Sequence, residues 1–267
     1  MKDTFDDSAD ILFNKNNRLG KFNLFSGWET AIVFRYSTVA NTIINNRNKF
    51  FKGKIPRILD IGSGSINFYK FWKNNFDSLG KFGIKYDALE YQQKYIDDFN
   101  LNKEFYNKGR DNLEIFKINL LKQSLNDIKE LKTKYEYVVC MEIIEHIGKK
   151  NAINLIKDIY QKMPRNGLLF VSSPSPDKSS GQKFVWEENH LYEFSYSEIT
   201  KLLSQNKFKI IDSFGWLGKA NNMKKKFNED QKILYNRLRS ISTGFASSIL
   251  AHLHPEFAEC YLIVAQK

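Results

Sequence analysis

The 267-residue sequence lacks several features that define whole classes of protein. Its two cysteines, Cys140 and Cys260, each lie in a strand-like apolar run, which argues against a disulfide framework and suits a reducing compartment. Only 5 prolines and 14 glycines are present, which excludes collagen-like and low-complexity chains. No apolar run approaches the ~20 residues of a membrane span, and the acidic first ten residues do not resemble a signal peptide. We therefore expect a cytoplasmic protein with no membrane span.

What is present is a large apolar fraction and an excess of positive charge. Hydrophobic residues make up 42% and aromatic residues 15%, enough for a packed core. The net charge is +11, and residues 219–239 hold seven Lys and Arg residues against two carboxylates. A basic cluster suits nucleic acid, phosphates or an anionic membrane, although lysine-rich coding would also raise the overall charge. A nucleic-acid partner bound through 219–239 is thus one possibility, and the oligomeric state stays open.

Apolar runs and helical patterns alternate from about residue 55. Strands are predicted at 55–61, 84–89, 113–120, 137–141, 168–172, 209–214 and 261–265. Helices are predicted at 28–51 (as one or two), 66–76, 91–99, 152–163 and 195–205, the last opened by a capping box of Ser195 and Glu198. Such alternation predicts an α/β fold with a mostly parallel sheet and helices on both faces. Ligands of these sheets bind beyond the carboxyl ends of the strands, so site residues should directly follow strands.

We divide the chain into four parts on this pattern. Residues 1–52 are a polar tail and helical cover, and residues 53–216 form the core. A basic helical insertion spans 217–258, and residues 259–267 return as the last strand of the core.

Two acidic groups and a glycine turn follow the first two predicted strands. The run from Asp60 through Gly62 and Gly64 connects a strand to a helix, where glycines let a ligand approach the backbone and the helix N-terminus adds donors. Glu90 ends the second strand, where a carboxylate can accept both hydroxyls of an adenosine ribose.

A Glu-x-x-Glu-His element follows the fourth predicted strand. If a helix begins there, Glu142, Glu145 and His146 share one face, and His190 from a later loop completes a four-ligand set for a hard divalent ion. Alternatively His146 or His190 serves as a general base, since an imidazole titrates near neutral pH. The third interpretation is purely structural, with the element capping a helix.

Further acceptor-site candidates lie in two other segments. Trp186 and Tyr192 belong to an aromatic loop that can wall an acceptor pocket, or that simply anchors the loop to the core. Arg35 and Tyr36, in the first predicted helix, can close over a ligand or hold an anionic acceptor through the guanidinium, or lie on an ordinary surface.

Taken in order, these motifs resemble class I S-adenosylmethionine-dependent methyltransferases. The resemblance covers about residues 55–215 and the final strand, and rests on Asp60-Ile-Gly-Ser-Gly, Glu90, Asn119, Cys140-Met-Glu-Ile-Ile-Glu-His146, Met163–Phe170 and His190–Glu198. It implies a Rossmann-like, seven-stranded sheet whose last strand is antiparallel. It also implies cofactor contacts from Asp60, Gly62 and Gly64 to the methionine part, from Glu90 to the ribose, and from Asn119 and Leu120 near the adenine, with Met141 beside them. Ile66 stands where the family often has a third glycine, and Asn119 where Asp is common.

The Glu-x-x-Glu-His element is similar to that of small-RNA 3′-end 2′-O-methyltransferases and of ubiquinone-pathway O-methyltransferases. This second resemblance implies a site for Mg²⁺ or Mn²⁺ at Glu142, Glu145, His146 and His190, where the metal holds neighbouring hydroxyls and lowers the pKa of the one attacked. We therefore expect an enzyme that uses S-adenosylmethionine to O-methylate a small hydroxylated acceptor such as a sugar, phenol or natural product. The alternatives are a nucleic-acid methyltransferase, acting by metal-assisted 2′-O-methylation, and an inactive cofactor-binding regulator.

Overall fold

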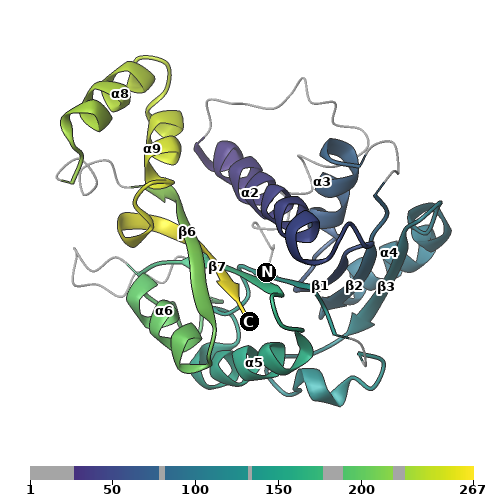
Figure 1. The fold of residues 1–267 in the computed structure, drawn as a ribbon. Coiled ribbons are helices and arrows are strands. Elements are labelled where there is room, and N and C mark those ends of the chain that lie inside the picture. The colour runs from purple at the N-terminus through teal and green to yellow at the C-terminus, as the bar shows by residue number, and fades with distance from the viewer. Residues whose placement is uncertain (1–26, 78–81, 132–133, 177–188, 219–225) are drawn as a thin grey trace.

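A seven-stranded sheet forms the centre of the molecule (Figure 1). The structure is a computed structural model that describes residues 27–77, 82–131, 134–176, 189–218 and 226–267. The strand order is β3-β2-β1-β4-β5-β7-β6, and only the contacts of β7 with β5 and β6 are antiparallel. The strands are β1 (Arg57–Ile61), β2 (Lys85–Glu90), β3 (Asn112–Lys117), β4 (Tyr137–Met141), β5 (Leu168–Pro174), β6 (Lys209–Gly218) and β7 (Ala258–Gln266). The predicted mostly parallel sheet with an antiparallel last strand is confirmed.

Helices cover both faces of this sheet, as the alternating pattern predicts. The described helices are α2 (Gly27–Phe50), α3 (Asn67–Asn75), α4 (Gln93–Tyr106), α5 (Gly148–Lys162), α6 (Tyr196–Gln205), α8 (Glu229–Arg239) and α9 (Thr243–Ala251), with short 3₁₀ turns η2 (Leu125–Asp127) and η3 (Pro255–Phe257). Residues 28–51 form one continuous helix, and Ser195 and Glu198 make the predicted capping box. The third strand stops at Lys117 rather than at residue 120, and the sixth continues to Gly218.

Alternate strand residues point into two separate cores. On β4, Val138 and Cys140 pack with α5 and α6, whereas Tyr137 and Val139 pack with α2, α3 and α4. This period of two is what a strand buried on both faces requires. Both cysteines are buried and unpaired, so neither forms a disulfide.

Helices α8 and α9 stand apart from these two cores. They share a small cluster that includes Phe227, Tyr235 and Leu250, and α9 also packs on β6 and α2. Figure 1 shows α8 at the outer edge of the molecule, beyond α9 and away from most of the sheet. Within the described residues, no helix has the length and apolar character needed to cross a membrane.

The prediction that a helix begins directly after β4 is wrong. Residues 142–147 form turns rather than the start of a helix, and α5 begins only at Gly148. Glu142 has φ +56°, a left-handed conformation that ends β4 and is incompatible with a helix. Glu142, Glu145 and His146 therefore do not share a helical face.

Candidate functional site

The turn after β1 is built around glycines in left-handed conformations. Gly62 has φ +72° and Gly64 has φ +54°. The N–H groups of Gly62 and Ser63 donate to the carbonyl oxygen of Leu89, at 2.8 and 3.1 Å, which ties the turn to β2. A Cβ on Gly62 would lie 1.8 Å from Cδ1 of Ile143. The backbone conformation thus favours glycine at 62, and an added side chain would also force the Ile143 side chain to move.

Ile66 occupies the position where the resembled family often has a third glycine. It has φ +55° and ψ +44° directly before α3, and its side chain is buried. A β-branched residue in this region is a genuine outlier that costs about 1–2 kcal/mol. The turn thus keeps the left-handed backbone that a glycine would favour, and the buried side chain offsets part of the strain.

Glu90 joins the ends of β1 and β2. One carboxylate oxygen accepts from the N–H of Gly64 at 2.8 Å, and the other accepts from the N–H groups of Tyr91 and Gln92, each at 2.8 Å. Three donors from two loops fix the orientation of this carboxylate at the edge of the sheet.

Asp60 lies beneath the same turn. Its carboxylate accepts from the hydroxyl of Tyr86. Burial raises the pKa of Asp60 to about 7, although the Tyr86 hydrogen bond favours the charged form and nearby Glu90 opposes it. Asp60 is therefore a buried acid that titrates near neutral pH.

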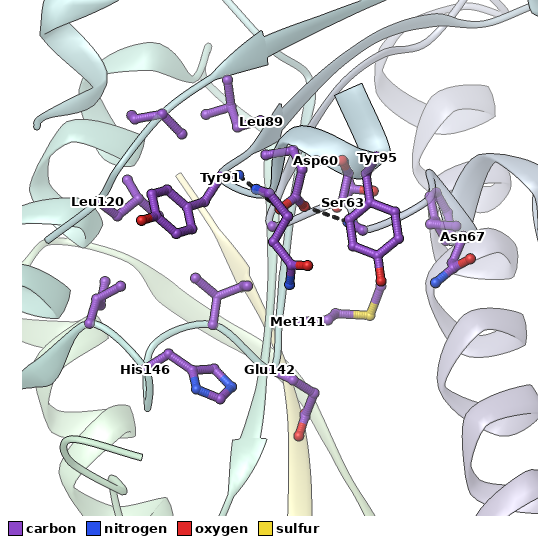
Figure 2. A pocket seen from close by; sticks show the side chains of 18 of the residues that line it. Asp60, Ser63, Asn67, Leu89, Tyr91, Tyr95, Leu120, Met141, Glu142 and His146 are labelled. Atoms are coloured by element: carbon purple, nitrogen blue, oxygen red, sulfur yellow. Dashed lines mark hydrogen bonds between the residues drawn. The ribbon is translucent and has the colours of Figure 1, made fainter. Parts of the chain in front are cut away.

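A cavity of about 400 Å³ opens beside the turn, at the carboxyl ends of β1, β2 and β4. Its size lies in the usual range for small-molecule sites. Figure 2 shows side chains from several loops around this space, with Tyr95 and Met141 facing one another and Glu142 and His146 on one side. Most residues predicted for the site line it, namely Asp60, Gly62, Gly64, Glu90, Asn119, Leu120, Met141, Glu142, His146, Arg35 and Tyr36.

Not every predicted residue reaches the cavity. Glu145, His190 and Tyr192 are not among its lining residues. The hydroxyl of Tyr192 instead donates to Glu198 at 2.7 Å and accepts from Lys149 at 2.9 Å, outside the cavity. Trp186 lies outside the described residues, as do Lys219, Lys224 and Lys225 of the basic segment.

A buried ion pair closes one end of the cavity. Nη1 of Arg35 lies 3.2 Å from Oε1 of Glu142, and the same oxygen accepts from the hydroxyl of Ser172 at 2.6 Å. The guanidinium also lies over the ring of Trp216, 4.6 Å from its centroid. Nε of Arg35 and Oε2 of Glu142 are buried with no hydrogen-bond partner among the described residues. Burial raises the pKa of Glu142, and Arg35 opposes this shift.

Behind this end of the cavity, three of the four predicted metal ligands lie together. Ligand atoms of Glu145, His146 and His190 are all within 4.8 Å of one another. Glu142 is not part of this group, because its carboxylate is turned to Arg35 and Ser172. Nδ1 of His190 lies 2.6 Å from Glu193, which leaves the other ring nitrogen for a ligand. Burial and the nearby Glu142 carboxylate raise the pKa of Glu145 well above its usual range, which opposes cation binding until the proton leaves.

Several lining residues were missed by the sequence reasoning. Tyr91 and Gln92 follow Glu90 directly, so the rule that sites lie beyond strand ends would have found them. Asn67, Tyr95 and Asn189 had no such signal, because they come from α3, α4 and a loop far along the chain.

The comparisons with known proteins agree with this architecture. The family model described as "Methyltransferase domain" matches residues 35–213, about two thirds of the chain. A search of the curated proteins found no match.

Three solved structures with this fold are distant from the chain in sequence. A SAM-dependent methyltransferase from Archaeoglobus fulgidus is 18% identical with a TM-score of 0.51, over 87% of this chain and 94% of that one. Magnesium protoporphyrin IX methyltransferase from Synechocystis PCC 6803, with bound SAM, is 12% identical with a TM-score of 0.53. The match covers 98% of this chain and 96% of that one. N-methyltransferase NodS from Bradyrhizobium japonicum WM9, in complex with S-adenosyl-L-homocysteine, is 10% identical with a TM-score of 0.51. The match covers 98% of this chain and 97% of that one. At such identities the likeness shows the fold alone.

Proposed function

The chain belongs to the methyltransferase-domain family, and on that premise we propose that it transfers a methyl group from S-adenosylmethionine to a hydroxyl of a small acceptor, such as a sugar, a phenol or a natural product. The proposal rests on one observation. The glycine turn and Glu90 line the same cavity as the ionisable residues Arg35, Glu142 and His146.

The residues present suit an adenosine-containing cofactor. Gly62 and Gly64 line the cavity without side chains, and the Glu90 carboxylate lines it too, with its orientation fixed by hydrogen bonds. We assign Asp60 and the glycines to the methionine part, Glu90 to the ribose, and Asn119 and Leu120 to the adenine. When bound, S-adenosylmethionine supplies a methyl group on a positively charged sulfur, which is displaced as a neutral thioether.

The protein's own contribution is orientation and proton removal. The cavity would hold the acceptor hydroxyl next to the methyl group that the cofactor supplies, and such positioning lowers a barrier by as much as ~7–11 kcal/mol. His146 lines the cavity and would accept the proton of the acceptor hydroxyl whose oxygen takes the methyl group. Its Nδ1 lies 3.4 Å from the carbonyl oxygen of Asn189, which orients the ring.

Two other functions make different use of these residues. Metal-assisted methylation of RNA would use the cluster of Glu145, His146 and His190 together with the basic 219–239 segment. An inactive cofactor-binding regulator would bind the cofactor without turnover.

Calorimetric titration of S-adenosylhomocysteine into chelator-treated protein tests the proposal, with repeats in Mg²⁺ or Mn²⁺ and with Glu145→Ala. We expect micromolar binding, about −8 kcal/mol, that does not depend on metal. Methylation of a panel of hydroxylated small molecules should then occur, and His146→Ala should reduce kcat by about 10²–10⁴ with unchanged cofactor affinity. Metal binding that Glu145→Ala abolishes would favour the RNA alternative, and absence of cofactor binding would exclude the proposal.

A further inference from the structure

The side-chain amide of Asn67 lies at the wall of the cavity with only one of its two polar groups engaged. The hydroxyl of Ser65 donates to Oδ1 of Asn67 at 2.7 Å, which fixes the amide. Nδ2 has no hydrogen-bond partner among the described residues, although Asn67 lines the cavity and is only 8% exposed. Figure 2 shows this side chain at the margin of the space that Tyr95 and Met141 also line. Because a buried donor without a partner costs free energy, Nδ2 indicates a ligand with a hydrogen-bond acceptor.

The first turn of α3 adds further donors beside this amide. Ile66, the residue before the helix, makes no side-chain cap hydrogen bond, and the first turn contains no acidic residue. The backbone N–H groups of Phe68 and Tyr69 have no acceptor among the described residues, and Phe68 also lines the cavity. Such N–H groups point toward the start of the helix and attract an anion together with the helix dipole. We call these donors the Asn67 corner and define it as the amide of Asn67 with the N–H groups of Phe68 and Tyr69.

The charges that line the cavity narrow the group that this corner can hold. Among the described residues that line it, Arg35 is the only Lys or Arg, and its guanidinium pairs with Glu142. Two further carboxylates, Asp60 and Glu90, lie at the strand ends beside the glycine turn. A ligand group that is only anionic would be repelled by them. A group that carries an ammonium beside its carboxylate avoids this repulsion, since the ammonium can face Asp60 while the carboxylate faces Asn67.

We propose that the Asn67 corner holds the carboxylate of the amino-acid part of S-adenosylmethionine, and that Ser65 orients the Asn67 amide for this contact. The inference rests on the proposed function, which assigns Asp60 and the glycines to the same part of the cofactor. Nδ2 of Asn67 donates to the carboxylate, and the N–H groups at the start of α3 stabilise its charge. Asn67 thus distinguishes ligands by the presence of a carboxylate, and Ser65 is a positioning residue because it acts through Asn67.

Two ligands that differ only in this carboxylate test the proposal. S-adenosylhomocysteine carries it, whereas the decarboxylated analogue, S-adenosyl-3-thiopropylamine, keeps the ammonium and lacks the carboxylate. In calorimetric titration, wild type should bind S-adenosylhomocysteine about tenfold or more tightly than the analogue. Asn67→Ala should weaken the binding of S-adenosylhomocysteine by about tenfold and leave the affinity for the analogue unchanged. The comparison in wild type needs no variant, so the test does not depend on how well a variant folds.

Asn67→Asp should separate the two ligands further. Its carboxylate repels that of S-adenosylhomocysteine, while an acidic residue in the first turn of a helix favours folding. We expect the affinity for S-adenosylhomocysteine to fall by about tenfold or more, and the affinity for the analogue to stay the same or rise. Ser65→Ala should weaken only S-adenosylhomocysteine, by about threefold, because the amide is still present but less well oriented.

The matched control is Asn74→Asp, the same substitution at an exposed position of the same helix. It should change neither affinity, and thermal unfolding checks that each variant is folded. The inference fails, while the proposed function stands, if wild type binds both ligands equally or if Asn67→Asp weakens both by the same factor. If wild type binds neither ligand, the proposed function fails and the inference fails with it.

Discussion

Arg35 on α2 and Glu142 at the end of β4 form a buried ion pair, with Nη1 and Oε1 3.2 Å apart at the wall of the cavity. The pair joins the helical cover to the sheet, and the Glu142 end is also held by Ser172 of β5. It thus links the shape of the cavity to the packing of α2.

Removing one member of this ion pair should lower the free energy of unfolding. Arg35→Leu leaves Glu142 buried without its counterion and should reduce the free energy of unfolding by about 3 kcal/mol. Arg35→Leu/Glu142→Gln should recover most of that loss, since Gln keeps an oxygen that can accept from Ser172. Urea denaturation measures the free energy of unfolding of both variants, and Arg237→Leu, at an exposed position, is the control. A double variant as unstable as the single one would contradict this account.

Gly62 should tolerate a side chain less well than Gly109 does. Gly62→Ala combines a left-handed backbone with a Cβ 1.8 Å from Ile143, whereas Gly109→Ala has φ +69° and nothing within 4 Å. We expect Gly109→Ala to cost about 1 kcal/mol of stability from backbone strain alone. Gly62→Ala should cost at least twice as much and weaken S-adenosylhomocysteine binding, as measured by urea denaturation and calorimetry. Equal losses at the two positions would show that the contact with Ile143 is unimportant.

The raised pKa of Asp60 predicts a pH dependence of stability. Its folded-state pKa of about 7 exceeds the unfolded value of 3.8, so the folded state binds more protons between these values. The contribution of Asp60 to stability is therefore greatest below pH 4 and falls as pH rises to about 7, by about 3 kcal/mol between pH 5 and pH 8. Asp60→Asn should remove this part of the slope in urea denaturation, and the exposed control Glu104→Gln should keep it. An unchanged slope in Asp60→Asn would contradict the raised pKa.

Glu90→Gln separates a structural from a ligand-binding role. The amide cannot accept from all three N–H groups that the carboxylate serves, so stability should fall by about 1–3 kcal/mol. If Glu90 also holds the ribose, the variant should bind S-adenosylhomocysteine at least tenfold more weakly. The 2′,3′-dideoxy analogue should then bind wild type and variant equally in calorimetry. If the variant binds both ligands more weakly by the same factor, Glu90 has a purely structural role.

The parts of the molecule with local signals were predictable from the sequence. Apolar runs gave the seven strands, and the glycine turn after Ile61 placed the cavity, because both depend on short-range patterns. The Glu-x-x-Glu-His element was misread because Glu142 adopts a left-handed conformation that no neighbouring residue type indicates. The partnership of Arg35 with Glu142 could not be predicted either, since it depends on how α2 crosses the sheet.

The position of β7 between β5 and β6 limits the order in which the sheet can form while the chain is synthesised on the ribosome. Strands β1 to β5 and the glycine turn are complete once residue 174 has emerged, and the nascent chain can pair them in the order of translation. Strand β6 has no neighbour until residues 258–266 follow, because its only partner in the sheet is β7. During that interval the apolar side chains of β6 and the open edge of β5 are exposed to other nascent chains. Losing residues 258–266 would therefore open the sheet in its interior and should promote aggregation more than the loss of an edge strand would.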